Sequence, residues 1–173
     1  EKYQIAVDRF LNLILLLAAL FLSFLVGVAA IDRWDTVLLY FNRVPFKLTD
    51  PVFYRDIGFY VFSLPLYQYL YSWALFTLAV TLLAAGFIHL YSGAIQLKKG
   101  LPIVAPAAKA HLSILAALIF FVVAWGYRLN AYLRLLTSEG IITGVGYADI
   151  NARLPVLQLL IVVAVICSAL FLI

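Results

Sequence analysis

The sequence predicts an all-α fold: a polytopic transmembrane helical bundle of four spans with an interfacial outer helix. The first observation is composition, because 66% of the 173 residues are hydrophobic and only 12% are charged, against about 25% charged residues in soluble domains. The second is length, because uncharged apolar segments approach the roughly 20 helical residues that cross a bilayer. The spans are expected at about 10–31, 64–95, 108–134 and 154–173.

The first span, 10–31, is followed by a charged loop that is rich in aromatic residues. Tyr and Trp side chains favour the membrane–water interface, so we expect one or two short helices on the membrane surface here. Asp50 and Pro51 resemble an N-cap followed by a proline at the first helical position. We therefore expect an outer helix over 50–62 that packs on the bundle through three phenylalanines, Phe53, Phe59 and Phe62.

The second apolar segment, 57–97, is too long for one crossing, because a continuous helix of this length would reach about 60 Å, twice the hydrocarbon core. Ser63, Leu64 and Pro65 supply a break, since they resemble a cap followed by a first-turn proline. The second span is therefore expected to begin at Leu64.

A short loop follows, and the third span is expected to begin near residue 108 and to continue as a helix to about 134. Within it, Ala110, Ala117 and Ala124 recur every seven residues. Small residues at such spacing let helices approach closely in lipid. A glycine-containing loop then leads to the fourth span at Leu154.

The placement of lysine and arginine indicates the orientation, because cytoplasmic loops are enriched in both. The loop with Lys98, Lys99 and Lys109 contains no acid, so we expect this loop and the N-terminus in the cytoplasm, with the aromatic and glycine loops outside. The net charge of +4 does not indicate a nucleic-acid partner, because the basic residues lie among acids or beside spans, where lipid headgroups are nearer.

No catalytic, cofactor or metal site is predicted. His89 and His111 lie at the same expected depth near the basic loop, but two histidines without a nearby carboxylate or cysteine make a poor metal site. Gly144 and Gly146 lack the third glycine and the preceding strand of a dinucleotide fingerprint. The span centres carry no Asp, Glu, Lys or Arg, which argues against a complete ion pathway.

The outer loops hold the candidate structural or functional residues, which are Asp50, Pro51, Arg55, Asp56, Gly144, Gly146, Tyr147, Asp149 and Arg153. Their acids are expected to cap helices and pair with arginines; cation binding or acid–base chemistry is the alternative. We expect the two loops to meet, with Asp56 or Asp149 held by an arginine, because arginine offers two donors to a carboxylate. The candidates are Arg55, Arg128 and Arg153.

Both outer loops resemble the hallmarks of uncharacterised protein family 0182. Residues 50–65 are similar to its aspartate-proline-x-phenylalanine, aspartate-x-x-phenylalanine-tyrosine and leucine-proline pattern, and residues 143–155 resemble its second hallmark. Ala148 stands where the family usually has threonine, which removes any role for a hydroxyl there. The resemblance implies a bacterial inner-membrane protein with about seven spans and a large extracytoplasmic C-terminal region, and it implies no known activity.

The chain contains no methionine and stops inside an apolar run, so we expect a fragment of a longer protein that covers about the third to sixth spans of the family. Its expected partners are the lipid bilayer, the missing spans and the extracytoplasmic region. The single cysteine, Cys167, lies in the fourth span, where we expect a small buried hydrophobic side chain.

The starts of the second and fourth spans share a short pattern. Leu64-Pro65 is repeated as Leu154-Pro155, and an Asp-Ile pair precedes each. This echo is either an internal repeat, which occurs in transporters, or a chance agreement between apolar segments.

The leading functional hypothesis is a non-enzymatic membrane domain that anchors and organises a larger envelope protein. Two alternatives stay open: a part of a transporter or channel, and an envelope-lipid or glycan-processing membrane enzyme. A polar internal cavity would favour transport. A groove converging on Asp50, Asp56 and Asp149 would favour an enzyme, and a dry, tightly packed bundle would favour the anchor.

Overall fold

The computed structural model of the chain describes residues 2–31, 33–98, 101–136 and 146–173. They form two compact units, Glu1–Val44 and Pro45–Ile173. Within the described residues, three helices are long and apolar enough to cross a membrane, and all three belong to the second unit: Phe59–Tyr91, Pro106–Leu133 and Asp149–Phe171.

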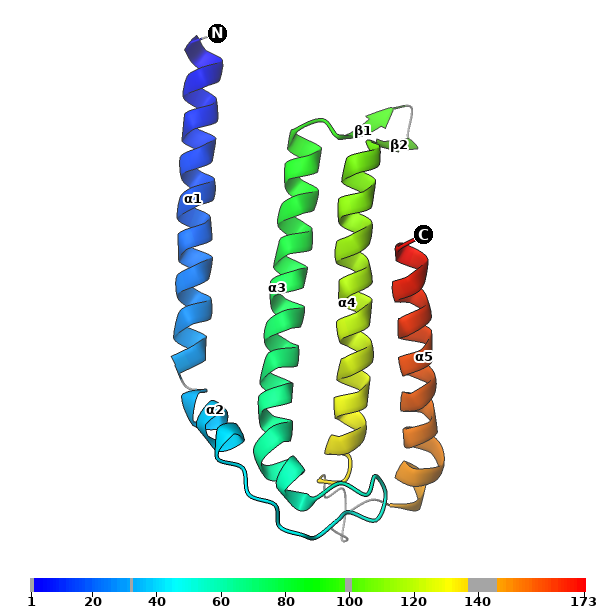
Figure 1. Ribbon diagram of the computed structural model, residues 1–173. Helices are drawn as coiled ribbons and strands as arrows, with labels where there is room; N and C mark the ends of the chain where they lie inside the picture. The colour runs from blue at the N-terminus through cyan, green and yellow to red at the C-terminus, as the bar shows by residue number, and fades with distance from the viewer. Residues whose placement is uncertain (1, 32, 99–100, 137–145) are drawn as a thin grey trace. The chain divides into compact units, whose positions relative to one another are not determined.

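The first unit contains helices α1 (Lys2–Ile31) and α2 (Trp34–Phe41) (Figure 1). Helix α1 covers the whole of the first expected span, and its described apolar stretch is Asn12–Val28. Helix α2 is a short helix of the kind predicted for the aromatic loop. It ends at Asn42, whose main-chain and side-chain N–H groups both donate to the Leu38 carbonyl.

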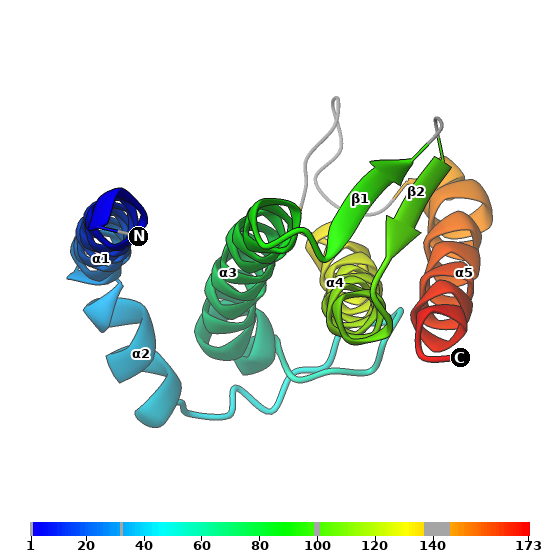
Figure 2. The same ribbon diagram turned by 90° about the horizontal axis from the view of Figure 1, so that it is seen from above.

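The second unit contains helices α3 (Leu64–Tyr91), α4 (Pro106–Leu133) and α5 (Leu154–Phe171). Helix α4 lies between the other two and packs against both, as the two views show (Figures 1 and 2). Large apolar side chains such as Phe76, Phe87 and Phe121 are exposed. Such a surface is costly in water and suits lipid.

Small residues line the buried face of α4. Ala117, Ala124 and Ala131 are buried at seven-residue spacing. The expected small-residue face is therefore present, but Ala131 belongs to it in place of Ala110, which is exposed. Opposite this face, the Ser168 hydroxyl of α5 donates a buried hydrogen bond of 2.8 Å to the Ala117 carbonyl. Close approach of the backbones is what makes this bond geometrically accessible.

Gly126 permits the corresponding contact between α4 and α3. A Cβ atom placed on this buried glycine would overlap the ring of Tyr71. A hydrogen atom in place of a side chain therefore allows the tyrosine ring to lie directly on the α4 backbone.

The expectation of a purely helical chain is wrong in the basic loop. Strands β1 (Ile95–Lys98) and β2 (Leu101–Val104) form an antiparallel hairpin in which Ile95 pairs with Val104. Helix α3 ends before it because Gly93 adopts a left-handed conformation, with φ of 72°, which is a common helix terminator. The second span consequently ends at Tyr91 rather than near residue 95.

Two π-helical turns, η1 (Phe59–Ser63) and η2 (Asp149–Arg153), run directly into α3 and α5. In each turn the N–H of the leucine that follows donates to a carbonyl five residues earlier. The next residue is proline, whose ring clashes with a regular preceding turn. A wider turn accommodates that ring, so the helices start before Leu-Pro rather than at it.

The predicted cap at Ser63 is therefore wrong, because Ser63 has helical φ and ψ and makes no side-chain capping bond. The predicted outer helix over 50–62 is also wrong. Residues 54–56 are not helical, and Tyr54 has a φ of 54°, which a helix does not allow. Helical structure begins at Ile57.

Candidate functional site

The first motif forms a compact loop over residues 45–58, called here the Asp50 loop. Its centre is the Asp50 carboxylate, which is only 8% exposed. Four donors surround it at 2.6–2.8 Å, and they are Val52 N, Phe53 N, Arg55 N and the hydroxyl of Tyr60. The Asp50-Pro51 pair predicts the start of a helix, but the amides that Asp50 caps belong to a turn.

These four bonds decide the chemistry that Asp50 can perform. Burial alone raises the pKa of the carboxyl, but the bonds from Phe53, Arg55, Tyr60 and Val52 outweigh it and hold the pKa below its ordinary value. A carboxylate offers about four acceptor positions, and here four are occupied. Asp50 therefore organises the loop and has no acceptor left for a proton or a cation.

Asp56 also orders the Asp50 loop by accepting main-chain hydrogen bonds, near the other end of the loop. It accepts main-chain N–H bonds from Phe46, Lys47 and Gly58, at 3.1, 2.8 and 2.7 Å. The pKa of Asp56 falls because these bonds outweigh its desolvation. They hold Lys47 at a φ of 59°, a conformation that non-glycine residues rarely adopt.

Aromatic side chains attach the Asp50 loop to the bundle. The rings of Phe53 and Phe59 lie edge-on to Tyr132 of α4, with centroids 4.8 and 5.2 Å away. Two of the three phenylalanines expected to pack on the bundle thus do so, whereas Phe62 stacks on Phe46. The buried cluster beneath consists of Tyr60, Leu64, Leu129 and Tyr132.

Two arginines of this region lie over aromatic rings. The Arg128 guanidinium is 5.0 Å from the Tyr132 ring centroid, and its Nε donates to the Tyr132 hydroxyl at 3.1 Å. Arg55 lies 5.4 Å from the centre of the Phe59 ring. Cation–π contact stabilises such pairs by about 0.5–2 kcal/mol, so both arginines reinforce the aromatic cluster.

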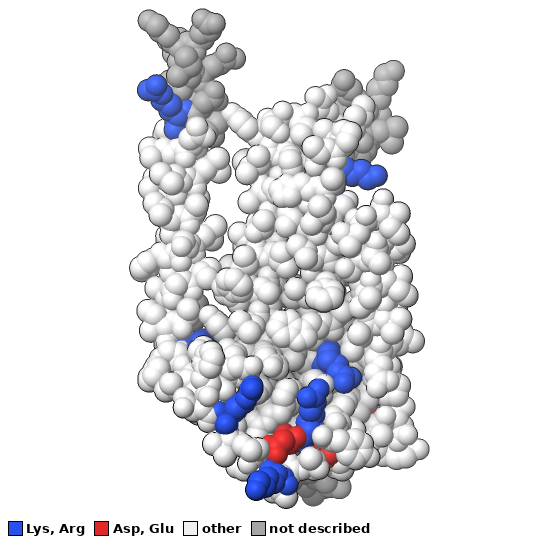
Figure 3. Space-filling view, in the orientation of Figure 1, with Lys and Arg blue, Asp and Glu red and all other residues white. Residues whose placement is uncertain are grey.

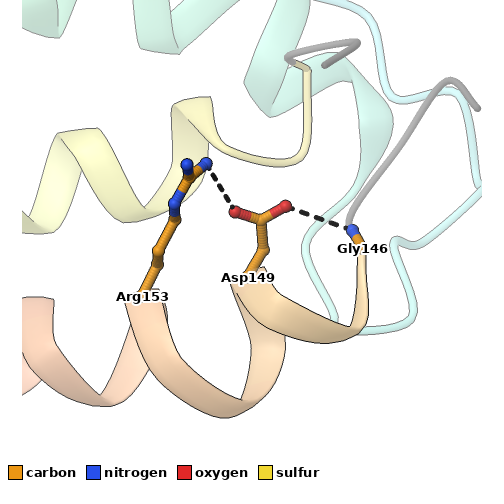
Figure 4. Close-up of polar contacts among 3 residues, drawn as sticks. All are labelled: Gly146, Asp149 and Arg153. Atoms are coloured by element: carbon orange, nitrogen blue, oxygen red, sulfur yellow. Dashed lines mark hydrogen bonds and ion pairs between the residues drawn. The ribbon is translucent and has the colours of Figure 1, made fainter. Parts of the chain in front are cut away.

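The second motif is organised by Asp149 within η2 (Figure 4). Its carboxylate accepts 3.2 and 3.1 Å bonds from the main-chain N–H of Gly146 and from Nη1 of Arg153. The pairing expected for Asp149 with Arg153 is therefore present. Tyr147 is 84% exposed.

Gly144 lies outside the described residues, and the expected meeting of the two motif loops stays a prediction. Pro51 is an exposed turn residue of the Asp50 loop.

Tyr60 was missed as the buried partner of Asp50, because ten residues separate the two and neither alternation nor helical spacing connects them. Among the described residues, no group of three His, Cys, Asp or Glu side chains is placed to hold a metal ion.

Charged side chains gather at the end of the second unit that carries the Asp50 loop, as the space-filling view shows (Figure 3). Helix α3 contains no Asp, Glu, Lys or Arg, and neither does α5. The charge distribution is that of helices whose middle faces hydrocarbon and whose ends face water.

The model of the uncharacterised protein family UPF0182 matches residues 1–173. The chain is similar to UPF0182 proteins of Frankia alni, with 34% identity over 99% of the chain, and of Cupriavidus necator, with 37% identity over 87%. It is 37% identical to one from Geobacter sulfurreducens over 84% of the chain. The matched part is 17%, 17% and 16% of these proteins. No solved structure matches.

Proposed function

Since this chain belongs to the uncharacterised protein family UPF0182, we propose that it is a membrane-embedded domain that anchors and organises a larger bacterial envelope protein. The relatives are about six times longer than the part they share with this chain. Most of a protein of that length lies outside the segment that matches this chain. The proposed role of the segment is to hold the rest of the protein in a defined position at the membrane.

The observation that carries the proposal is the state of the acids in the Asp50 loop. Asp50 and Asp56 use seven hydrogen bonds, six of them from main-chain N–H groups, to order one loop. An acid–base residue needs a free lone pair within reach of its substrate. Asp50 accepts four bonds and Asp56 three, of the about four that a carboxylate can accept. This engagement, complete at Asp50, supports a structural role, as does the close packing of α4 on both neighbours.

The finer topology belongs to the same proposal. Helix α1 also spans the membrane, as the first of four spans along the chain. The protein is a multi-pass protein of the inner membrane, and the N-terminus and the Lys98–Lys99 hairpin face the cytoplasm. The hairpin contributes basic residues beside two spans, which the positive-inside rule places on that side. The Asp50 loop and η2 then face outward.

Two exposed tyrosines provide the contact surface for the rest of the protein. Tyr54 is 77% exposed in the Asp50 loop, and Tyr147, which precedes η2, is 84% exposed. Tyrosine combines a large apolar ring with a polar tip, which is why it is enriched in interfaces. An ordered loop presents such a ring with little loss of entropy on binding.

Photo-crosslinking tests the proposal directly. A photoreactive phenylalanine analogue replaces Tyr54 or Tyr147 in the full-length protein in native membranes, and Phe87, a 64% exposed residue of α3, serves as the lipid-facing control. We expect positions 54 and 147 to crosslink to the extracytoplasmic region of the same polypeptide, and position 87 to crosslink to lipid. Crosslinks of all three positions to lipid alone would refute the proposal.

A further inference from the structure

The chain's two histidines meet at the hairpin end of the bundle. His89 lies in the last turn of α3 and His111 in the second turn of α4. Nε2 of His89 and Nδ1 of His111 are 3.2 Å apart, and the two rings are nearly perpendicular. Side chains separated by 22 residues thus direct one nitrogen each toward the same point between two helices.

The distance between the two histidine nitrogens is close to the separation of two nitrogens that bind the same metal ion. Two Zn–N bonds of about 2.0–2.1 Å at a tetrahedral angle separate the nitrogens by about 3.3–3.4 Å. A small rotation of the two rings would aim both lone pairs at an ion beside the line that joins the nitrogens. The sequence predicts both histidines at one depth near the basic loop, but two histidines without a nearby carboxylate or cysteine indicated a poor metal site. The structure adds that their ring nitrogens lie in contact.

The surroundings leave room for the rest of a coordination shell. His111 is exposed and His89 is half-buried, so water can complete the ligands, as it does in metal sites that keep an open position. The Ser92 hydroxyl donates to the His89 carbonyl at 3.3 Å, close to the point where α3 ends. The ion can reach this end from the aqueous phase on the hairpin side.

We propose that His89 and His111 bind a divalent transition-metal ion of the zinc class. Imidazole nitrogen is a preferred ligand of Zn, Cu and Ni. In the metal-free pair one ring N–H donates a hydrogen bond to the nitrogen of the other ring. On metal binding the donor ring changes tautomer, so that its proton moves to its other nitrogen and both facing nitrogens coordinate the ion. The bound ion clamps α3 to α4 at the hairpin end, a role that goes beyond anchoring.

A zinc titration of thermal unfolding tests the site, using the full-length protein with a histidine-free affinity tag. His89→Gln and His111→Gln keep a hydrogen-bonding amide but remove a metal ligand. His111→Cys, made in a Cys167→Ala background, supplies a thiolate ligand instead. We expect zinc to raise the unfolding midpoint of the wild type and of the cysteine variant by several degrees, and to leave both glutamine variants unchanged.

Cobalt provides a readout that does not depend on stability. With His111→Cys, bound Co²⁺ is expected to show a thiolate-to-cobalt charge-transfer band that His89→Gln in the same background abolishes. Equal midpoint shifts in the wild type and the glutamine variants would refute the site, because the ion would then bind elsewhere. Because an ion that binds only the folded state must raise its stability, no shift in the wild type at about 1 mM zinc would also refute the site and leave the pair as a hydrogen bond.

Discussion

At the scale of single residues, Asp50 and Asp56 take the place of solvent as the hydrogen-bonding partner of six main-chain N–H groups in the loop. An unpaired buried donor costs about 1–3 kcal/mol, and each acid satisfies several donors at once. The rarely adopted φ values of Lys47 and Tyr54 are tolerated because these bonds hold the surrounding backbone. The two carboxylates thus compensate for the local strain of two residues.

Replacing Asp50 with asparagine is expected to lower the free energy of unfolding by about 1–3 kcal/mol, because charge-assisted bonds to a buried acceptor become neutral ones and one oxygen is lost. Asp35→Asn is the matched control, since Asp35 is exposed in the first turn of α2. Unfolding of the detergent-solubilised protein measures both. Equal losses in the two variants would contradict the role given to Asp50.

The same residue predicts a dependence on pH. Because the folded-state pKa of Asp50 lies below its ordinary value of 3.8, its stabilising contribution is complete above that value and is lost as the pH falls through the folded-state pKa. The unfolding midpoint of the wild type should therefore fall more steeply below about pH 4 than that of Asp50→Asn. Parallel curves for the two proteins would show that Asp50 is not the group responsible.

At the scale of secondary-structure elements, α4 approaches each neighbouring helix closely at a point where α4 carries a small residue. Gly126 admits the Tyr71 ring, and Ala117 admits the Ser168 hydroxyl. In lipid, where apolar surface gains nothing by leaving the solvent, such close backbone contacts supply the association energy. The bundle is therefore sensitive to the addition of single methyl groups at these points.

Gly126→Ala is expected to destabilise the protein by about 1–3 kcal/mol, because the new methyl group overlaps the Tyr71 ring and forces α3 and α4 apart. Gly86→Ala is the control, since nothing lies within 4 Å of a Cβ at that glycine; it should be neutral or slightly stabilising. Thermal unfolding in detergent compares the two. A neutral Gly126→Ala would show that Tyr71 moves aside without cost.

Ser168→Ala removes the hydrogen bond between α5 and α4 and is expected to cost about 0.6 kcal/mol, and at most about 1.7, as interhelical bonds in membranes do. Ser72→Ala, at an exposed serine of α3, should have no effect. Measured together by unfolding in detergent, the pair separates the bond from general effects of a lost hydroxyl. A cost above about 3 kcal/mol would indicate a further role of Ser168.

The sequence predicted these elements unevenly, for identifiable reasons. Uncharged length and the positions of Pro65 and Pro155 located α3, α4 and α5 to within a few residues. Helix α1 begins at Lys2, well before the expected start at residue 10. The π-helical turns were missed because a proline at a helix start and one after a wide turn have the same local sequence. The hairpin was missed because Ile95 and its neighbours continue an apolar run, and only the φ of Gly93 separates strand from helix.

At the scale of the whole molecule, the chain matches a segment of relatives that are about six times as long as that segment. Its second unit contains three candidate spans and the two motif loops, whereas the first contains α1 and α2. A bundle with polar ends and an uncharged middle needs a defined orientation in the membrane, and the hairpin and the motif loops mark its two ends.

Cysteine labelling in a Cys167→Ala background is expected to show that orientation. Tyr147→Cys should react with a membrane-impermeant thiol reagent in spheroplasts of the bacterial cell, because position 147 is exposed on the proposed outer side. Lys98→Cys should react only after the membrane is opened. Labelling of position 98 from outside, with protection of position 147, would reverse the proposed topology.

The two π-helical turns also give α3 and α5 the same possible movement. A π-turn holds one residue more than the α-helical repeat, so loss of that extra residue would advance the helix beyond it by about 1.5 Å and rotate it by about 100°. Helices α3 and α5 flank α4 and carry this step at the same place relative to Leu-Pro. In both α3 and α5, a change of one residue in the π-turn would therefore shift and rotate the whole helix. A displacement of the preceding motif loop would reach this turn before it reaches the rest of the helix.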